Sequence, residues 1–230
     1  QPDVICFQEV LPHVAVWLKE NLEGYYVIGC GRDEKLGDEQ VSVAYRRDTV
    51  NLISMDTFWL SGEPHVPGSR YDCQSICPRV CTEAVFSYTG DPGKEYLFRL
   101  YNIHLDHLGG EARRLGLELI LKRADQEPAF PGIPVILAGD FNAEPDSPEL
   151  AVLERCSDFT NVTEGIGITY HGFEPEDTPE RIDHIFAGRP FVCQNVEKWE
   201  DRDGEVWLSD HYPICAVLEC EPGKIGRASC

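Results

Sequence analysis

Short apolar runs bounded by polar residues recur along the whole chain, which is the pattern of buried strands. These runs lie at 4–7, 25–28, 41–46, 50–60, 80–88, 96–105, 133–138, 181–187 and 211–218. The runs 41–46 and 50–60 are close enough to predict one hairpin. The runs 80–88 and 96–105 predict a second hairpin, because an Asp-Pro-Gly turn separates them. Strands are therefore expected to form most of the core.

Two longer segments repeat their apolar residues at helical spacing, so helices are predicted over 11–22 and 111–125. A short helix is predicted over 147–153, because a serine there is followed by a proline that suits the first helical position. The chain has no internal repeat or linker. We therefore predict one α/β domain over residues 1–223, with residues 224–230 interpreted as a non-native tail.

Charge narrows the range of partners. The 230 residues contain 40 acidic and 20 basic side chains, which gives a formal net charge of −20. A field of this sign repels polyanions, whereas nucleic-acid-binding proteins offer basic surfaces to the phosphates. The charge disfavours nucleic acid as a partner. No run approaches the roughly 18 apolar residues of a transmembrane helix, so no such segment is expected.

The ten cysteines are spread along the chain, and several lie inside apolar runs, where free thiols behave as small hydrophobic groups. The one cluster is Cys73, Cys77 and Cys81, whose spacing differs from a two-residue metal knuckle. A zinc module at this cluster stays open as a rival interpretation. We expect a reduced, cytoplasmic monomer, with secretion left open because a preceding segment would carry any signal.

Acidic, amide and imidazole side chains gather where the predicted strands begin or end. They are Glu9, His104, His107, Asp140, Asn142, Asp183, Asp210 and His211. Loops at strand ends commonly carry functional groups on a rigid scaffold. Each residue alone also has a structural explanation; Asp183 beside Arg181, for example, suits a surface ion pair. Their combination and order favour a functional site.

Five segments in this order resemble the endonuclease/exonuclease/phosphatase superfamily. They are PDVICFQE at 2–9, NIHLDH at 102–107, GDFN at 139–142, RIDHIF at 181–186 and SDHYP at 209–213. The segments FWLS at 58–61 and PGS at 67–69 resemble a bacterial and fungal subgroup of undefined substrate. The resemblance implies a four-layer α/β sandwich like deoxyribonuclease I, with two packed mixed sheets and outer helices. It also implies that a first strand, which carries an asparagine of the metal site, is missing before Pro2.

The resemblance also implies a divalent-metal site. Glu9 would be the principal ligand, and Asp210 would lie at or beside a second metal position. Mg²⁺ is the expected ion, with Mn²⁺ as the alternative, because carboxylate oxygens suit hard cations.

The same resemblance assigns catalytic roles. His211 would handle the attacking water or the phosphate, and Asp183 would orient its ring. Asp140 would orient or deprotonate the water. Asn142 and His104 would contact the phosphate. Arg32, in the glycine-rich loop, and His107 would bind the substrate.

The predicted activity is metal-dependent hydrolysis of a phosphoester, with a small phosphorylated molecule, a monoester or a diester, as the substrate. A Mg²⁺-dependent nuclease is the alternative within the same class. A non-catalytic binding protein on the same fold is the alternative from another class. The presence of all seven principal site residues argues against it; they are Glu9, His104, Asp140, Asn142, Asp183, Asp210 and His211.

Overall fold

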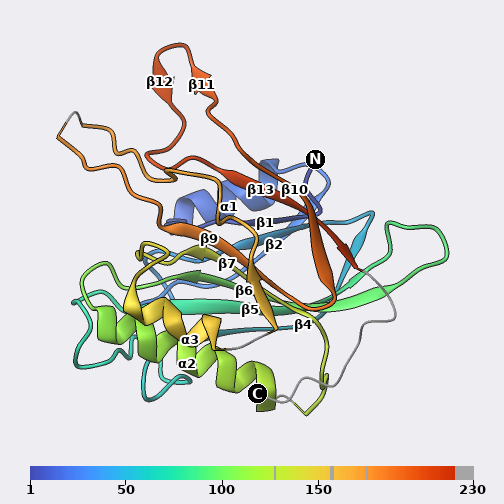
Figure 1. Ribbon diagram of the computed structural model, residues 1–230, viewed down its shortest axis with the longest axis horizontal. Helices are drawn as coiled ribbons and strands as arrows, with labels where there is room; N and C mark the ends of the chain where they lie inside the picture. The colour runs from blue at the N-terminus through green and yellow to red at the C-terminus, as the bar shows by residue number, and fades with distance from the viewer. Residues whose placement is uncertain (127, 156–157, 175, 221–230) are drawn as a thin grey trace.

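A computed structural model describes residues 1–126, 128–155, 158–174 and 176–220. Within these residues the chain forms four layers (Figure 1). Helix α1 covers one side of the strands, helices α2 and α3 cover the other side, and two layers of strands pack between them. The predicted α/β sandwich is confirmed.

The central layer is a six-stranded sheet in the order β4-β5-β6-β7-β9-β8. Its strands are β4 (Val50–Trp59), β5 (Val80–Tyr88), β6 (Tyr96–His104), β7 (Val135–Asp140), β8 (Phe159–Asn161) and β9 (Asp183–Gly188). Strands β6 and β7 are parallel, and the other neighbouring pairs are antiparallel. The ends of β6 and β7 therefore meet the start of β9 at one edge of the sandwich.

The second layer of strands consists of two hydrogen-bonded groups. One has the order β1-β3-β2, and the other pairs β10 with β13. The strands are β1 (Val4–Cys6), β2 (Tyr25–Ile28), β3 (Val43–Arg46), β10 (Phe191–Lys198) and β13 (Ile214–Cys220). Strands β11 (Arg202–Asp203) and β12 (Val206–Trp207) form a small hairpin that projects from the body (Figure 1).

Two apolar cores lie on the two faces of the central sheet, and a smaller cluster that includes Ala15 and Leu18 holds α1. Between the strand layers, Val43 and Tyr45 of β3 pack with Phe86 and Phe98 of the central sheet. Between the central sheet and the helices, the buried residues include Phe58, Tyr101, Ile103, Leu117 and Ile120. Burying large apolar side chains of this kind stabilises the fold by roughly 1.5–3 kcal/mol each.

The helices agree with the sequence pattern. They are α1 (Pro12–Asn21), α2 (Gly110–Gln126), a 3₁₀ turn at Pro148–Leu150 and α3 (Ala151–Glu154). Pro12 and Pro148 both occupy the first turn of their helices. Backbone N–H groups in the first turn have no partner within the helix, so a proline, which lacks this group, loses no hydrogen bond there. Ser147 takes the N-cap position, but its side chain makes no capping hydrogen bond. No helix of the described residues is long and apolar enough to cross a membrane.

The predicted hairpin between 41–46 and 50–60 is wrong. Strand β3 pairs with β1 and β2, whereas β4 pairs with β5, so the chain passes from one sheet to the other between them. Residues Val43 and Val50 belong to the same core between the two sheets. Val43 and Val50 face this core, whereas Phe58, later in β4, faces the core on the helix side. Adjacency in sequence therefore does not make the two segments partners. The predicted tail at 224–230 lies outside the described residues.

Candidate active site

The register of the central sheet brings three side chains together. His104, which ends β6, lies opposite Asp140, which ends β7, and Asp140 lies opposite Asp183, which begins β9. Gly139 permits this close approach, because a Cβ atom there would lie 2.0 Å from the carbonyl oxygen of Ile103, and its φ is +137°. Only glycine tolerates both conditions.

His211 completes a group that we call the Asp183 cluster, which consists of Asp140, Asp183 and His211. The Nδ1 atom of His211 lies 2.8 Å from the Oδ2 atom of Asp183. Thr169 holds this pair from both sides. Its hydroxyl accepts a hydrogen bond from the amide of Asp183 at 3.0 Å, and its carbonyl oxygen accepts one from the amide of Tyr212 at 2.7 Å. The ring orientation of His211 is thus fixed by main-chain contacts as well as by the carboxylate.

Burial and charge shift the pKa values of this cluster. Burial, followed by the neighbouring carboxylate of Asp183, raises the pKa of Asp140 to about 7. Burial lowers the pKa of His211, but the hydrogen bond and charge of Asp183 and the charge of Asp140 outweigh it and raise that pKa to about 9. Near neutral pH the imidazole of His211 is therefore protonated, and Asp140 is able to exchange a proton.

A second group, the Glu9 cluster, consists of Glu9, Glu39 and His104. The ligand atoms of each cluster lie within 4.8 Å of one another. The Nε2 atom of His104 lies 3.3 Å from Oδ2 of Asp140, so the two clusters adjoin. Burial, together with Arg79 and Arg32, holds the pKa of His104 well below its usual value, which keeps its ring neutral.

The position of Glu9 depends on the residue before it. The side-chain amide nitrogen of Gln8 donates a hydrogen bond of 2.8 Å to Oδ1 of Asn102, a buried residue on β6. The backbone of Glu9 adopts φ +55°, which is uncommon for a residue other than glycine. Strain of this kind tends to gather at functional sites.

Two arginines line the same small cavity as the Glu9 cluster. The cavity holds about 10 Å³, which is close to the space of one water molecule. The guanidinium of Arg32 lies 2.9 Å from Asp38 and 2.7 Å from Glu39. Arg79 is only 5% exposed, and its Nε and Nη1 atoms have no hydrogen-bond partner among the described residues. The buried carboxylate of Asp106 lies 4.0 Å from Nε, so Nη1 is the donor that is available to an anionic ligand.

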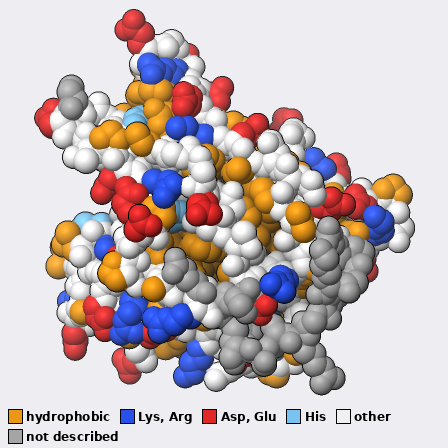
Figure 2. Space-filling model, viewed as in Figure 1, with side chains coloured by type: hydrophobic (Ala, Val, Ile, Leu, Met, Phe, Trp, Pro, Cys, Tyr) orange, Lys and Arg blue, Asp and Glu red, His pale blue; other side chains and the backbone are white. Residues whose placement is uncertain are grey.

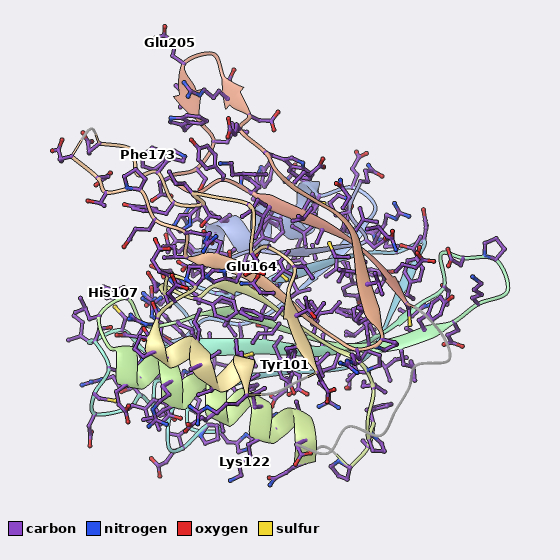
Figure 3. All side chains as sticks on the ribbon, in the orientation of Figure 1. Tyr101, His107, Lys122, Glu164, Phe173 and Glu205 are labelled. Carbon is purple, nitrogen blue, oxygen red and sulfur yellow. The ribbon has the colours of Figure 1, made fainter. Side chains whose placement is uncertain are left out.

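Three other predicted residues lie at the margin of this arrangement. Asn142 adopts φ +48°, and its side-chain amide donates a hydrogen bond to the carbonyl oxygen of Leu105 at 3.0 Å. His107, labelled in Figure 3, is exposed. Its Nδ1 lies 3.1 Å from Nη2 of Arg79. Asp210 belongs to neither cluster of the described residues, although its carbonyl oxygen accepts hydrogen bonds from the amides of His171 and Gly172.

The structure therefore unites Glu9, His104, Asp140, Asp183 and His211, with Arg32 beside them. Sequence reasoning missed Glu39 and Arg79. Glu39 closes the polar glycine-rich loop just before the apolar run at 41–46, and Arg79 directly precedes β5. A charged residue at a strand boundary was the available signal, but many exposed residues give the same signal.

The three clustered cysteines do not form a metal-binding group. In the described part of the chain, the potential metal-binding groups contain carboxylates and imidazoles but no thiol. Cys81 is buried in the core of the central sheet, where burial raises its pKa well above the usual value, whereas Cys73 is exposed. The zinc-module interpretation is therefore not supported.

Solved structures similar to this chain share its fold. An endonuclease/exonuclease/phosphatase from Bacteroides vulgatus is 30% identical, with a TM-score of 0.85 over 95% of this chain and 85% of that one. A mannosyl-6-phosphatase from Bacteroides thetaiotaomicron is also 30% identical, with a TM-score of 0.79 over 94% and 85% of the two chains. TDP2 from D. rerio, solved with a single-strand DNA product, is 19% identical, with a TM-score of 0.71 over 95% and 86%, and shows the fold alone.

A search of curated proteins found no match. The sequence profile described as the Endonuclease/Exonuclease/phosphatase family matches residues 1–211, which include both clusters. With this match over most of its length, the chain belongs to the endonuclease/exonuclease/phosphatase family.

Proposed function

We propose that the chain hydrolyses a small phosphomonoester with the help of a divalent metal ion. The observation that carries the proposal is the adjacency of the two clusters through His104 and Asp140. One cluster offers an oriented imidazolium and a carboxylate that titrates near neutral pH. The other offers carboxylates for a cation, and Arg79 offers donors for an anion. Phosphoryl transfer needs this combination of positioning and charge stabilisation.

The Glu9 cluster suits a divalent ion. Burial raises the pKa of Glu39, Arg32 lowers it, and the negative charge of Glu9 raises it further. Two carboxylates that repel each other are stabilised by a shared cation, and their oxygens suit Mg²⁺ or Mn²⁺. The imidazole of His104 suits Mn²⁺ better than Mg²⁺. Glu9 and Glu39 would hold the ion, which when bound would polarise a phosphoryl oxygen and stabilise the leaving alkoxide.

The residues of the Asp183 cluster would handle protons and charge. Asp140 would take a proton from the attacking water, because a base with a pKa near the working pH is the most effective. The Nε2 atom of His211 would donate a hydrogen bond to the phosphoryl group while Asp183 holds Nδ1. Arg79 would bind a phosphoryl oxygen through Nη1, which has no hydrogen-bond partner among the described residues. Asp210 is proposed as a more distant contributor to metal binding, through its position next to His211.

Two observations favour a small monoester over nucleic acid. The net charge of −20 repels a polyanion. Affinity for nucleic acid comes largely from basic side chains that displace counterions from the phosphates, and a chain with twice as many acidic as basic residues gains little from this effect. Among the similar structures at 30% identity, one is a mannosyl-6-phosphatase. A nuclease remains the second candidate because TDP2, with its DNA product, has the same fold.

A substrate panel tests the proposal. The purified chain is assayed with Mg²⁺, with Mn²⁺ and with chelator against p-nitrophenyl phosphate, bis-p-nitrophenyl phosphate and supercoiled plasmid. We expect metal-dependent turnover with the monoester preferred, and its loss in His211→Ala. His13→Ala, at an exposed position of α1, is the matched control and should leave the rate unchanged.

Each other outcome has a clear meaning. Preference for plasmid would establish the nuclease alternative. Turnover that survives both chelator and His211→Ala would contradict the proposed site. Absence of turnover on every phosphoester, including those tested below, would favour the non-catalytic binding protein.

A further inference from the structure

A second and larger cavity opens beside His211. It holds about 230 Å³ and lies at the base of the projecting β11–β12 hairpin. Its lining includes Trp199, Asp201, Trp207, Leu208 and Tyr212, together with His211 itself. Because His211 also belongs to the Asp183 cluster, whatever fills this cavity lies next to the group that would act on the phosphate.

The aromatic walls of this cavity, which we call the Trp207 pocket, are held from outside. The ring of His171 packs against Trp207 with centroids 4.6 Å apart and against Tyr212 at 4.4 Å. The guanidinium of Arg202 lies 3.3 Å from the centre of the Trp207 ring, and the amine of Lys198 lies 4.5 Å from that of Tyr212. Such cation–π contacts fix the rings in place. The pocket is therefore preorganised.

Apolar side chains around the Trp207 pocket face solvent. Leu208 is 67% exposed and Trp199 is 37% exposed, and Val206 of β12 and Phe173 are also exposed. Figure 2 shows hydrophobic side chains gathered below the hairpin, and Figure 3 places Phe173 on the loop that projects beside it. Exposed apolar side chains beside a polar site are characteristic of ligand binding.

We infer that the Trp207 pocket binds the sugar ring of a carbohydrate phosphate whose phosphoryl group lies at His211. A pyranose has an apolar face of C–H groups, which suits the exposed side chains of Trp199 and Leu208. It also has an edge of hydroxyl donors, which suits the carboxylate of Asp201 and the hydroxyl of Ser209. The inference rests on the proposed phosphomonoesterase and names its substrate class.

The geometry favours a sugar over a nucleobase. The planes of Trp207 and Tyr212 meet at 79°, so these rings do not form a parallel slot that would sandwich a flat base. Proteins that bind bases by stacking use open aromatic faces beside a basic groove. Here Arg202 already lies over Trp207, and an acidic side chain lines the pocket. A neutral polyol meets no charge penalty in this setting.

The test compares two phosphomonoesters that differ in the alcohol only. The ratio of kcat/KM for a hexose 6-phosphate to that for ethyl phosphate is measured in the wild type, in Trp207→Ala and in Leu208→Ala. We expect the wild type to prefer the hexose phosphate, and both variants to lower the ratio by roughly tenfold, the scale of losing apolar contacts in a specificity pocket. Trp17→Ala, at an exposed tryptophan of α1 outside the pocket lining, should leave the ratio unchanged.

A direct binding measurement separates this inference from the proposed function. Tryptophan fluorescence is titrated with the hexose 6-phosphate in chelator, where no turnover is expected. Saturable quenching that Leu208→Ala weakens would support the pocket even if no phosphoester were hydrolysed. Hydrolysis of ethyl phosphate with equal efficiency and no quenching would overturn the pocket while leaving the phosphomonoesterase intact. A higher kcat/KM for adenosine 5′-monophosphate than for any hexose phosphate would overturn the assignment to carbohydrate.

Discussion

The two clusters at the strand ends are built in different ways. In the Asp183 cluster, Asp140 and Asp183 are opposite each other in the central sheet, and Thr169 fixes the approach to His211. In the Glu9 cluster, His104 is the sole member on a strand. Glu9 lies just after β1 and Glu39 just before β3, so both belong to loops of the other sheet. One cluster is set by sheet register and the other by the packing of two sheets.

The difference extends to charge. The Asp183 cluster contains its own cation, because His211 is protonated at neutral pH. In the Glu9 cluster the imidazole of His104 is neutral. The negative charge of the carboxylates is balanced by the neighbouring guanidinium groups of Arg32 and Arg79. We therefore expect substitutions in the first cluster to affect turnover most, and substitutions in the second to affect the response to metal and to the phosphate.

The largest effect is expected for Asp183→Asn. The amide no longer fixes the tautomer and the charge of His211, so kcat should fall by about 10³–10⁴-fold, as for other oriented imidazoles. The fold should persist, because the amide retains the size of the carboxylate and the main-chain contact with Thr169. Steady-state kinetics and circular dichroism measure the two effects. Asp146→Asn, at an exposed carboxylate, is the control. A near-normal rate would make Asp183 purely structural.

The Asp183 cluster was predictable from the sequence for a physical reason. Asp140 and Asp183 are attached directly to apolar strands that sequence periodicity detects, and His211 lies just before another. Glu39 and Arg79 were not predictable in this way, because their proximity depends on how the loops at 29–39 and 61–79 fold over the strand ends. The mistaken hairpin at 41–60 has the same origin: periodicity detects a buried strand but does not identify its partner.

Glu39→Gln sharpens the contrast with the Asp183 cluster. Loss of one carboxylate charge should weaken metal binding, so the Mn²⁺ concentration for half-maximal activity should rise by roughly 10–100-fold. The activity at saturating Mn²⁺ should recover to a large part, unlike that of Asp183→Asn. Activity is measured as a function of metal concentration, with exposed Glu23→Gln as the control. An unchanged metal response would remove Glu39 from the proposed metal site.

Arg79→Gln should have a smaller effect than Glu39→Gln, and this effect should be on the binding of the phosphate. Loss of a charge-assisted contact with the phosphoryl group should raise KM for the monoester by about tenfold, the scale of one hydrogen bond to a charged group. Arg70→Gln, at an exposed arginine of the same loop, should leave KM unchanged. If Arg79→Gln lowered the melting temperature but not the affinity for inorganic phosphate, the side chain would be structural.

The smallest expected effect is a pH dependence of stability that arises from the Asp183 cluster. It can be measured without a substrate. The pKa of His211 is about 9 in the folded chain, against an ordinary 6.5. A histidine with a raised pKa stabilises the fold fully below its unfolded pKa, and this contribution is lost as pH rises through the folded value. The wild type should therefore lose its stability advantage over Asp183→Asn between about pH 6.5 and pH 9.

NMR titration of the His211 ring in metal-free protein measures the same pKa directly. The midpoint should be near 9 in the wild type and lower in Asp183→Asn. An identical midpoint in the two proteins would mean that the carboxylate does not hold the proton on His211, and the division between a self-neutralised cluster and a metal-binding cluster would fail.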